Sequence, residues 1–177
     1  MEIKFKEGSL RSNRNSYLPT TRSEFDFRVW FDESCLFEFP TDGWHKIVGR
    51  ATNGSHWHKD SYRLGWRPRL DLGKIELAGY TYRKGVRQTI PNKHHETEED
   101  FNVHLGFLDP NEEARIVMYH QRFKYVFQLH KGDVMQSLIR LPARKEKNWI
   151  PGFNLNPYMA SSIPATQDFH YNIIYSD

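Results

Sequence analysis

Apolar and polar residues alternate with a period of two along most of this 177-residue chain, and this alternation predicts β-strands. In the segment 25–32, the odd positions are apolar and most even positions are polar, as in a half-buried strand. The segment 101–107 repeats the pattern, and the longest such run extends from Ala114 to His130. That run is compatible with one bent strand or with a hairpin that turns near His120-Gln121-Arg122.

Shorter runs with strand-like composition are Glu2–Lys6, Leu36–Phe39, His45–Ala51, Ser61–Arg67, Lys74–Tyr82, Ser137–Leu141 and Phe169–Tyr175. Turn signals such as Lys84-Gly85 separate them. No long segment has the 3.6-residue period of a helix. Many short strands joined by regular turns are typical of a sandwich or barrel, and we predict an all-β chain folded as a two-sheet antiparallel β-sandwich, a jelly roll.

Two segments lack the strand pattern. Residues 8–23 are polar and arginine-rich, which indicates a loop or arm. Residues 145–165 are rich in proline and aromatic residues, which indicates an ordered loop packed on the sandwich. The remaining length fits one domain, so we predict a single β-sandwich domain over residues 1–177.

Composition narrows the class of protein. Aromatic residues make up 15% of the chain, so it can bury a large core and is not a disordered segment. The formal charge of +3 is spread without a basic helix or stripe, so we expect no duplex nucleic acid partner. No apolar stretch resembles a signal peptide or a membrane span, and we expect no membrane partner and a cytoplasmic or particle-assembled location. Cys35 is the sole cysteine, and we interpret it as a small buried hydrophobe.

The strand Ser61–Arg67 carries the first candidate binding residues. Tyr62, Leu64 and Trp66 fall on one face, which we assign to the core. Arg63 and Arg67 project from the other face, where two guanidinium groups suit a carboxylate, sulfate, phosphate or sugar hydroxyl. The alternative is that these arginines are solvated or pair with acidic residues of adjacent strands.

The next strand adds two tyrosines. Tyr80 and Tyr82 fall on the polar side of Lys74–Tyr82, and Gly79 marks a candidate bulge that resets the facing. These tyrosines are suited either to stacking on sugar rings or to cross-strand packing. Arg87 follows at the next turn.

His56 and His58 are separated by one residue, so on a strand both imidazoles would face the same way. No third ligand is tied to them by the sequence, and we interpret the pair as hydrogen-bonded loop residues rather than a metal site. Trp57 and His58 are assigned to the rim of the binding face. The chain has no Gly-rich phosphate loop, nucleophile elbow or zinc-binding cysteine spacing, and we expect no cofactor and assign no catalytic residue.

At the level of pattern, the segment from Phe25 to Tyr175 resembles the concanavalin A-like lectin/glucanase jelly rolls. The resemblance implies two antiparallel sheets, with polar and aromatic groups on one face. Gln128-Leu129-His130 is also similar to the Gln-Ile-His motif of jelly-roll polysaccharide lyases of the alginate-lyase type. Their Arg-x-Glu-x-Arg segment is absent and the motif order is reversed, so no catalytic role is carried over.

These observations favour binding over catalysis. The leading hypothesis is a non-catalytic β-sandwich domain for a glycan or another anionic or polar ligand, bound by Arg63, Arg67, Tyr80, Tyr82, Trp57 and His58. The alternative is a structural subunit of a homo-oligomer or larger assembly, such as a virion or tail component, with the same face as a protein interface. A third hypothesis is a polysaccharide lyase or hydrolase on the same scaffold.

Overall fold

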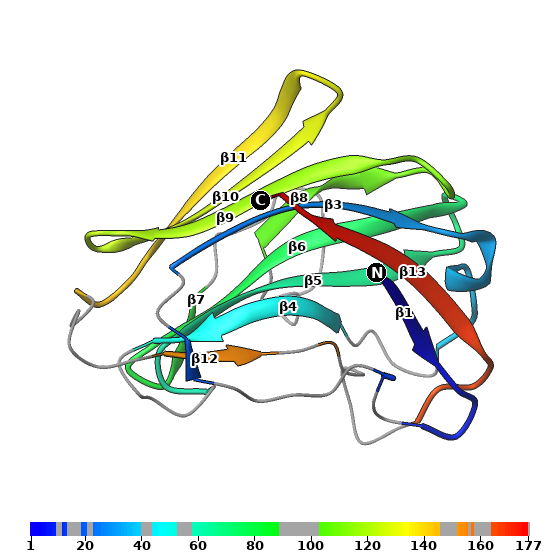
Figure 1. The fold of residues 1–177 in the computed structure, drawn as a ribbon, viewed down its shortest axis with the longest axis horizontal. Coiled ribbons are helices and arrows are strands. Elements are labelled where there is room, and N and C mark those ends of the chain that lie inside the picture. The colour runs from blue at the N-terminus through cyan, green and yellow to red at the C-terminus, as the bar shows by residue number, and fades with distance from the viewer. Residues whose placement is uncertain are drawn as a thin grey trace.

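Two antiparallel sheets face each other in the computed structural model (Figure 1). The structure describes residues 1–9, 12–13, 19–20, 23–39, 44–52, 58–88, 103–145, 152–155, 157 and 164–176. The six-stranded sheet contains, in spatial order, β1 (Glu2–Phe5), β13 (Phe169–Tyr175), β3 (Glu24–Phe31), β9 (Ala114–Gln121), β10 (Lys124–Lys131) and β11 (Val134–Pro142). This arrangement confirms the predicted two-sheet antiparallel sandwich.

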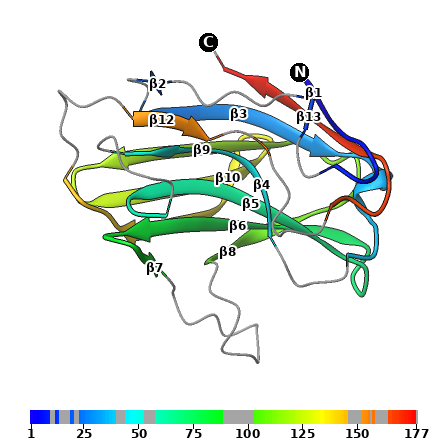
Figure 2. The ribbon, with the colours of Figure 1, turned by 90° about the horizontal axis from the view of Figure 1, so that it is seen from below.

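The seven-stranded sheet contains, in order, β2 (Pro19–Thr20), β12 (Gly152–Leu155), β4 (His45–Ala51), β5 (Ser61–Arg69), β6 (Lys74–Arg83) and β7 (Val86–Gln88). Its seventh strand, β8 (Val103–Leu108), pairs with the beginning of β6, while β7 pairs with its end. Figure 2 shows this sheet from below, with β5 and β6 at its centre. Those two central strands carry the candidate binding residues.

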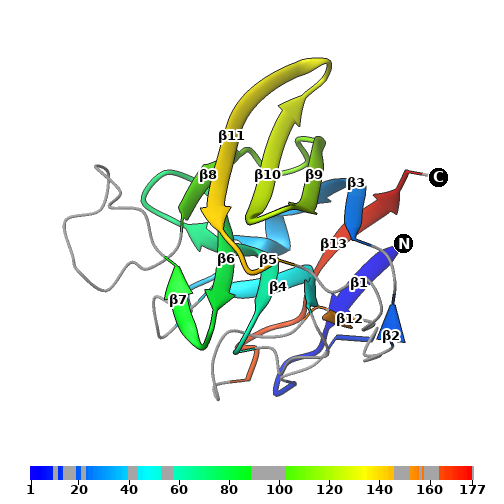
Figure 3. The same cartoon turned by 90° about the vertical axis from the view of Figure 1, so that its left-hand side faces the viewer.

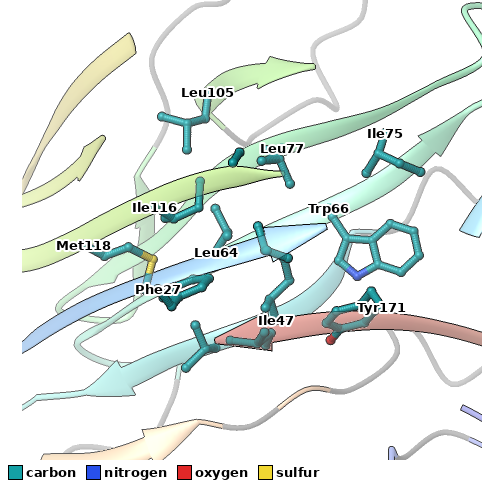
Figure 4. Packing of buried hydrophobic residues seen from close by; sticks show 14 of the residues in the cluster. Phe27, Ile47, Leu64, Trp66, Ile75, Leu77, Leu105, Ile116, Met118 and Tyr171 are labelled. Carbon is teal, nitrogen blue, oxygen red and sulfur yellow. The ribbon is translucent and has the colours of Figure 1, made fainter. Parts of the chain in front are cut away.

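The core lies between the sheets and is rich in aromatic side chains. Tyr62, Leu64 and Trp66 of β5 are fully buried there, as the alternation predicts. Trp66 packs edge-on against Tyr171 of β13, with ring centroids 5.9 Å apart (Figure 4). Such rings bury the largest apolar areas available to a side chain, so they contribute strongly to holding the sheets together.

The long run from Ala114 to His130 is a hairpin and not a bent strand. Strands β9 and β10 pair in continuous register, with Lys124 opposite Gln121. Arg122 lies in the connecting turn with a φ of 54°, a left-handed conformation that is common in tight turns. The alternation could not decide this point because it continues with the same period on both sides of the turn.

The prediction of a strand at Leu36–Phe39 is wrong. These residues are irregular and follow a short 3₁₀ helix, η1 (Glu33–Cys35), which the Asp32 carboxylate caps by accepting from the Ser34 backbone N–H at 2.8 Å. Cys35 is fully buried, as predicted, and burial raises the pKa of its thiol. In the described part of the chain, no helix is long and apolar enough to cross a membrane.

Both segments that lack a strand pattern in the sequence contain a short strand. β12 lies within residues 145–165 and pairs with β4 on one side, and β2 lies within residues 8–23 and pairs with β12. A Cβ atom at Gly152 would lie 2.6 Å from the carbonyl oxygen of Ala51, so glycine lets β12 lie close to β4. Strands of four and two residues are too short to show a two-residue period.

Candidate functional site

The candidate binding residues of β5 and β6 share the outer face of the seven-stranded sheet, which points away from the six-stranded sheet. Arg63 pairs with Tyr80, Arg67 with Glu76 and Ser61 with Tyr82, so these side chains project on the same side. The pairing continues without interruption through position 79.

The expectation that Gly79 resets the facing of β6 is therefore wrong. The irregularity lies on the opposite edge of β6, where its pairing with β8 shifts between Leu77 and Ala78. Gly79 faces the core, where a Cβ atom would lie 3.2 Å from ring carbons of Phe127. The lack of a Cβ atom at position 79 thus allows β6 to pack closely against the Phe127 ring.

Three cationic side chains surround the ring of Tyr80. The Lys46 ammonium lies 3.9 Å from the ring centroid, and the guanidinium carbons of Arg87 and Arg63 lie 4.3 and 5.9 Å from it. The hydroxyl of Tyr80 shares a hydrogen bond of 3.2 Å with that of Tyr82. We call Lys46, Arg63, Tyr80, Tyr82 and Arg87 the Tyr80 cluster.

The members of the Tyr80 cluster differ in their access to solvent. Arg63 is 1% exposed and Tyr80 7%, and Lys46 is likewise buried, so these three are the buried members of the cluster. Tyr82 and Arg87 are half-buried. The exposed His58 stacks on the Tyr82 ring with centroids 5.1 Å apart and planes 28° apart. A ligand that approaches this face would meet Tyr82, Arg87 and His58 first.

Lys46 reaches the cluster because β4 contains a bulge. Lys46 pairs with Gly65 and Val48 with Leu64, which leaves Ile47 as an extra residue on β4. Strict alternation would place Lys46 and Val48 on the same face. With the extra residue, Lys46 points outward while Val48 is buried in the core.

Gly49 makes room for Arg63. These residues pair across β4 and β5, and a Cβ atom at position 49 would lie 2.6 Å from Cγ of Arg63 and 2.2 Å from the carbonyl oxygen of Tyr62. Contacts this short do not occur between real atoms, so only glycine fits here. The absence of a side chain at position 49 lets the Arg63 side chain lie across β4.

Charge and burial set the protonation preferences of the Tyr80 cluster. Burial, followed by the charges of Arg63 and Arg87, lowers the pKa of Lys46 well below its usual value. Burial and the hydrogen bond to Tyr80 raise the pKa of Tyr82 to about 12. The Tyr82 phenol is therefore neutral at physiological pH and serves as a hydrogen-bonding group rather than a base.

A second cluster occupies the same outer face around the fully buried Glu76, and we call Glu76, Arg67, Arg69 and His104 the Glu76 cluster. The Glu76 carboxylate lies 2.8 Å from Nε of Arg67, 3.3 Å from Nη1 of Arg69 and 2.9 Å from Nδ1 of His104. Arg67 also lies over the Trp44 ring, 4.6 Å from its centroid.

The partners of Glu76 stabilise its ionised form. Burial raises its pKa, but the hydrogen bond from His104 and the charge of Arg67 outweigh burial and lower the pKa to about 2. Arg67 thus adopts the alternative left open by the sequence, an ion pair with an acidic residue of an adjacent strand. The structure places Arg63 and Arg67 on the same face but in different clusters.

Asp60 fastens the segment that carries His58 to the hairpin between β6 and β7. Its buried carboxylate accepts the backbone N–H of Lys84 at 2.9 Å. Lys84 and Gly85 form the turn, both with positive φ angles of 54° and 82°, which confirms the predicted turn there. The turn returns the chain as β7 and brings Arg87 opposite Tyr82.

Sequence reasoning located only part of the Tyr80 cluster. It assigned Arg63, Tyr80, Tyr82 and His58 to the binding face but did not include Lys46. Trp57, also assigned there, lies outside the described residues. Among the residues that the structure describes, no group of three or more His, Cys, Asp or Glu side chains is arranged to hold a metal ion.

Comparison with known proteins finds likeness only at the level of structure. No family model matches the chain, and no curated protein matches it. A solved alginate lyase from Alteromonas sp.272 is 10% identical, with 99% of this chain and 77% of that chain covered and a TM-score of 0.49. A functionally unknown protein from Saccharomyces cerevisiae is also 10% identical, with 99% and 88% covered and a TM-score of 0.46.

Chicken galectin 2 is 11% identical, with 98% of this chain and 97% of that chain covered and a TM-score of 0.36. At these identities the likenesses concern the fold and do not bear on function. The two antiparallel sheets of the chain agree with the two-sheet arrangement that the pattern-level resemblance implies.

Proposed function

We propose that the chain is a non-catalytic β-sandwich domain that binds a glycan or another anionic or polar ligand at the Tyr80 cluster. The observation that carries the proposal is the gathering of Lys46, Arg63 and Arg87 around one tyrosine ring on a rigid sheet face. Hydrogen-bonding groups held by a rigid scaffold bind a ligand with little loss of conformational entropy.

Each accessible member of the site has a distinct role in this proposal. Tyr82 and His58 present flat rings and polar edges to a sugar ring, and the Arg87 guanidinium suits a carboxylate or sulfate group. Arg63 lies beneath them, where burial reduces screening by water and strengthens its attraction for an anion. The preferred ligand is therefore a charged sugar rather than a neutral one.

The Glu76 cluster contributes differently. Its arginines already face a carboxylate within the protein, so their charge is largely balanced before any ligand arrives. We assign Arg67 a supporting role, since its guanidinium holds Trp44 and Glu76 in place at the side of the ligand site.

The test is a binding titration with polyuronate, heparin and dextran as the acidic, sulfated and neutral probes. We expect measurable affinity for at least one charged polymer, little for dextran, and a loss of more than roughly tenfold for Tyr82→Ala and Arg87→Ala. The matched control is Arg28→Ala, which removes an exposed cation from the six-stranded sheet and should bind as the unmodified chain does.

Equal affinities for Tyr82→Ala, Arg87→Ala and Arg28→Ala would contradict a site at the Tyr80 cluster. So would an absence of binding to all three polymers. Affinity that falls as salt concentration rises supports the contribution of the cationic residues, because screening weakens interactions between charges.

A lyase or hydrolase is the second candidate, and the Glu76–His104 pair favours it. A buried carboxylate hydrogen-bonded to an imidazole orients that ring as a general base requires. His104 pairs with Ala78, two residues from Tyr80 on the same face. Release of unsaturated sugars from polyuronates, measured by ultraviolet absorbance and lost in His104→Ala, would favour this candidate over simple binding.

A further inference from the structure

Strand β11 is a long open edge of the six-stranded sheet. In the described part of the chain it pairs with β10 and with no strand on its other side. Val134 is 63% exposed and Met135 48% exposed, and most of the strand is accessible to solvent. Figures 1 and 3 show that the β10–β11 hairpin projects beyond the rest of the sandwich. An exposed edge of this length is a template for pairing with another strand.

The other edges are shorter or occupied. The β1 edge is covered by Asn13, whose side-chain oxygen accepts from the Lys4 N–H at 2.9 Å and whose N–H donates to the Lys4 carbonyl at 3.0 Å. The β2 and β7 edges are only two and three residues long. On β8, the carbonyl of Leu105 accepts the hydroxyl of Ser137. Natural sheets commonly protect their edges in these ways. On β11, Ser137 contacts β8 and the register with β10 shifts near Gln136, which leaves the segment from Leu138 to Pro142 as its regular open edge.

The backbone groups at the open edge can be assigned from one hydrogen bond. The N–H of Ala143 donates to the Phe123 carbonyl at 2.7 Å, so residue 143 points toward β10. Because backbone groups alternate along a strand, Leu138 and Arg140 point their N–H and C=O groups outward. Pro142 also faces outward, where its missing N–H leaves no donor unsatisfied.

We propose that two copies of the chain associate through β11, which pairs antiparallel with itself across a two-fold axis at Leu138. The six-stranded sheets of the two copies then join edge to edge. In this register Leu138 lies beside its counterpart, and Arg140 lies opposite the irregular part of β11 in the other copy, around Gln136. Arg140 is the sole charged residue of β11, so antiparallel pairing keeps like charges apart, whereas parallel pairing would place the two arginines side by side.

A second copy fits this edge better than an open chain of subunits. The other edge of the same sheet is covered by Asn13, so β11 of one copy cannot pair with β1 of the next. The contact is therefore isologous and closes as a dimer, because each copy contributes the same strand. The site lies on the sheet opposite the Tyr80 cluster, so the dimer does not depend on ligand binding.

The first test measures the mass of the full-length chain by sedimentation or light scattering over a wide range of concentrations. We expect twice the monomer mass at high concentration and a reversible shift to monomer on dilution. Leu138→Lys places two ammonium groups at the axis and should raise the dissociation constant more than roughly tenfold. Leu72→Lys, which adds the same charge at an exposed apolar position far from β11 in the sequence, is the control and should leave the dimer intact.

The second test does not depend on weakening the dimer. Residues opposite each other at a two-fold axis bring their Cβ atoms to about 5 Å, from which a small backbone shift brings two cysteines into the range of a disulfide. Oxidised Leu138→Cys should therefore give a covalent dimer in denaturing electrophoresis, while the buried native Cys35 should not. A chain that stays monomeric at every concentration, a dimer that Leu138→Lys leaves unchanged, or an oligomer that grows beyond two copies would overturn the proposal.

Discussion

The Tyr80 cluster and the Glu76 cluster lie on the same face of the seven-stranded sheet and share strands β5 and β6, yet their basic side chains have different described partners. In the Glu76 cluster, Arg67 and Arg69 contact one fully buried carboxylate. In the Tyr80 cluster, Lys46, Arg63 and Arg87 surround a tyrosine ring. A ring attracts cations less strongly than a carboxylate does, and it does not neutralise their charge.

The difference teaches that a count of basic residues on a sheet face does not locate an anion site. Arg63 and Arg67 are four residues apart on β5 and project from the same face, but Arg67 serves the internal ion pair with Glu76. The Glu76 cluster resembles a structural network, whereas the Tyr80 cluster gathers basic side chains around one ring. Substitutions that act on one cluster and not on the other test this distinction.

The largest effect is expected from Glu76→Gln. Removing the carboxylate leaves Arg67, Arg69 and His104 without their shared counter-charge in a buried setting, which should lower the free energy of unfolding by about 3–5 kcal/mol. Urea denaturation monitored by tryptophan fluorescence measures this loss in the free energy of unfolding. Asp109→Asn, which breaks an exposed pair with Lys74, is the control and should change stability little. Equal losses in the two variants would show that Glu76 is not a structural centre.

Low pH should remove the contribution of the Glu76 carboxylate to stability. The pKa of Glu76 is about 2 in the folded chain, below its ordinary value of 4.5, so its stabilisation is present above pH 4.5 and is lost as the pH falls toward 2. The unmodified chain and Glu76→Gln should differ by about 3 kcal/mol in their free energy of unfolding above pH 4.5, and we expect this difference to disappear as the pH falls toward 2. Unfolding titrations of both proteins at successive pH values measure it, and a difference that does not vary with pH would contradict the assigned pKa.

Gly49→Ala should damage the Tyr80 cluster through the backbone. A Cβ atom at position 49 would lie 2.2 Å from the Tyr62 carbonyl oxygen, so β4 and β5 must separate and Arg63 must move, with a loss of about 1–3 kcal/mol. Gly65→Ala provides the comparison on the same strand pair, because its nearest neighbours would be at an ordinary 3.5 Å. Thermal melts of both variants separate the two outcomes, and similar melting temperatures would contradict the steric argument.

Lys46→Met should have the smallest effect on stability, and it should stabilise the fold where the other substitutions destabilise it. Burial and two neighbouring guanidinium groups lower the pKa of Lys46, so an apolar side chain of similar length should stabilise the fold by roughly 1 kcal/mol at neutral pH. The advantage should shrink as the pH rises toward 10.5, because lysine in the unfolded chain then also becomes neutral. A loss of affinity for charged polymers in the same variant would show that Lys46 takes part in ligand binding.

The alternation of side chains predicted most of the sheet framework. The strand Phe169–Tyr175 matches its predicted limits, because the alternation of a half-buried strand is a local property of its sequence. The strand His45–Ala51 also matches its predicted limits, although it is buried throughout. The partner of Arg67 could not be predicted in this way. It depends on the register between β5 and β6, and a two-residue period holds no information on which residues of two strands lie opposite each other.

The outward facing of Lys46 could not be predicted from the sequence for a different reason. The extra residue Ile47 interrupts the alternation of β4, and in the sequence His45–Ala51 nothing distinguishes a bulge from a regular strand. Arg87 was recognised as part of a basic turn, but its approach to Tyr80 depends on the two-residue hairpin at Lys84-Gly85. The members that sequence reasoning missed or placed loosely thus depend on backbone irregularities.

The bulge at Ile47 also bears on how this strand tolerates loss of a codon. Without residue 47, Lys46 would still face outward, Val48 inward and Gly49 outward, because the remaining residues alternate regularly. Loss of a codon after Gly49 would instead exchange the inward and outward sets of the residues that follow. In a scan that deletes one codon of β4 at a time, we therefore expect the deletion of residue 47 to keep the inward and outward facing of the strand. Its main cost in stability should be the cavity left by the isoleucine side chain.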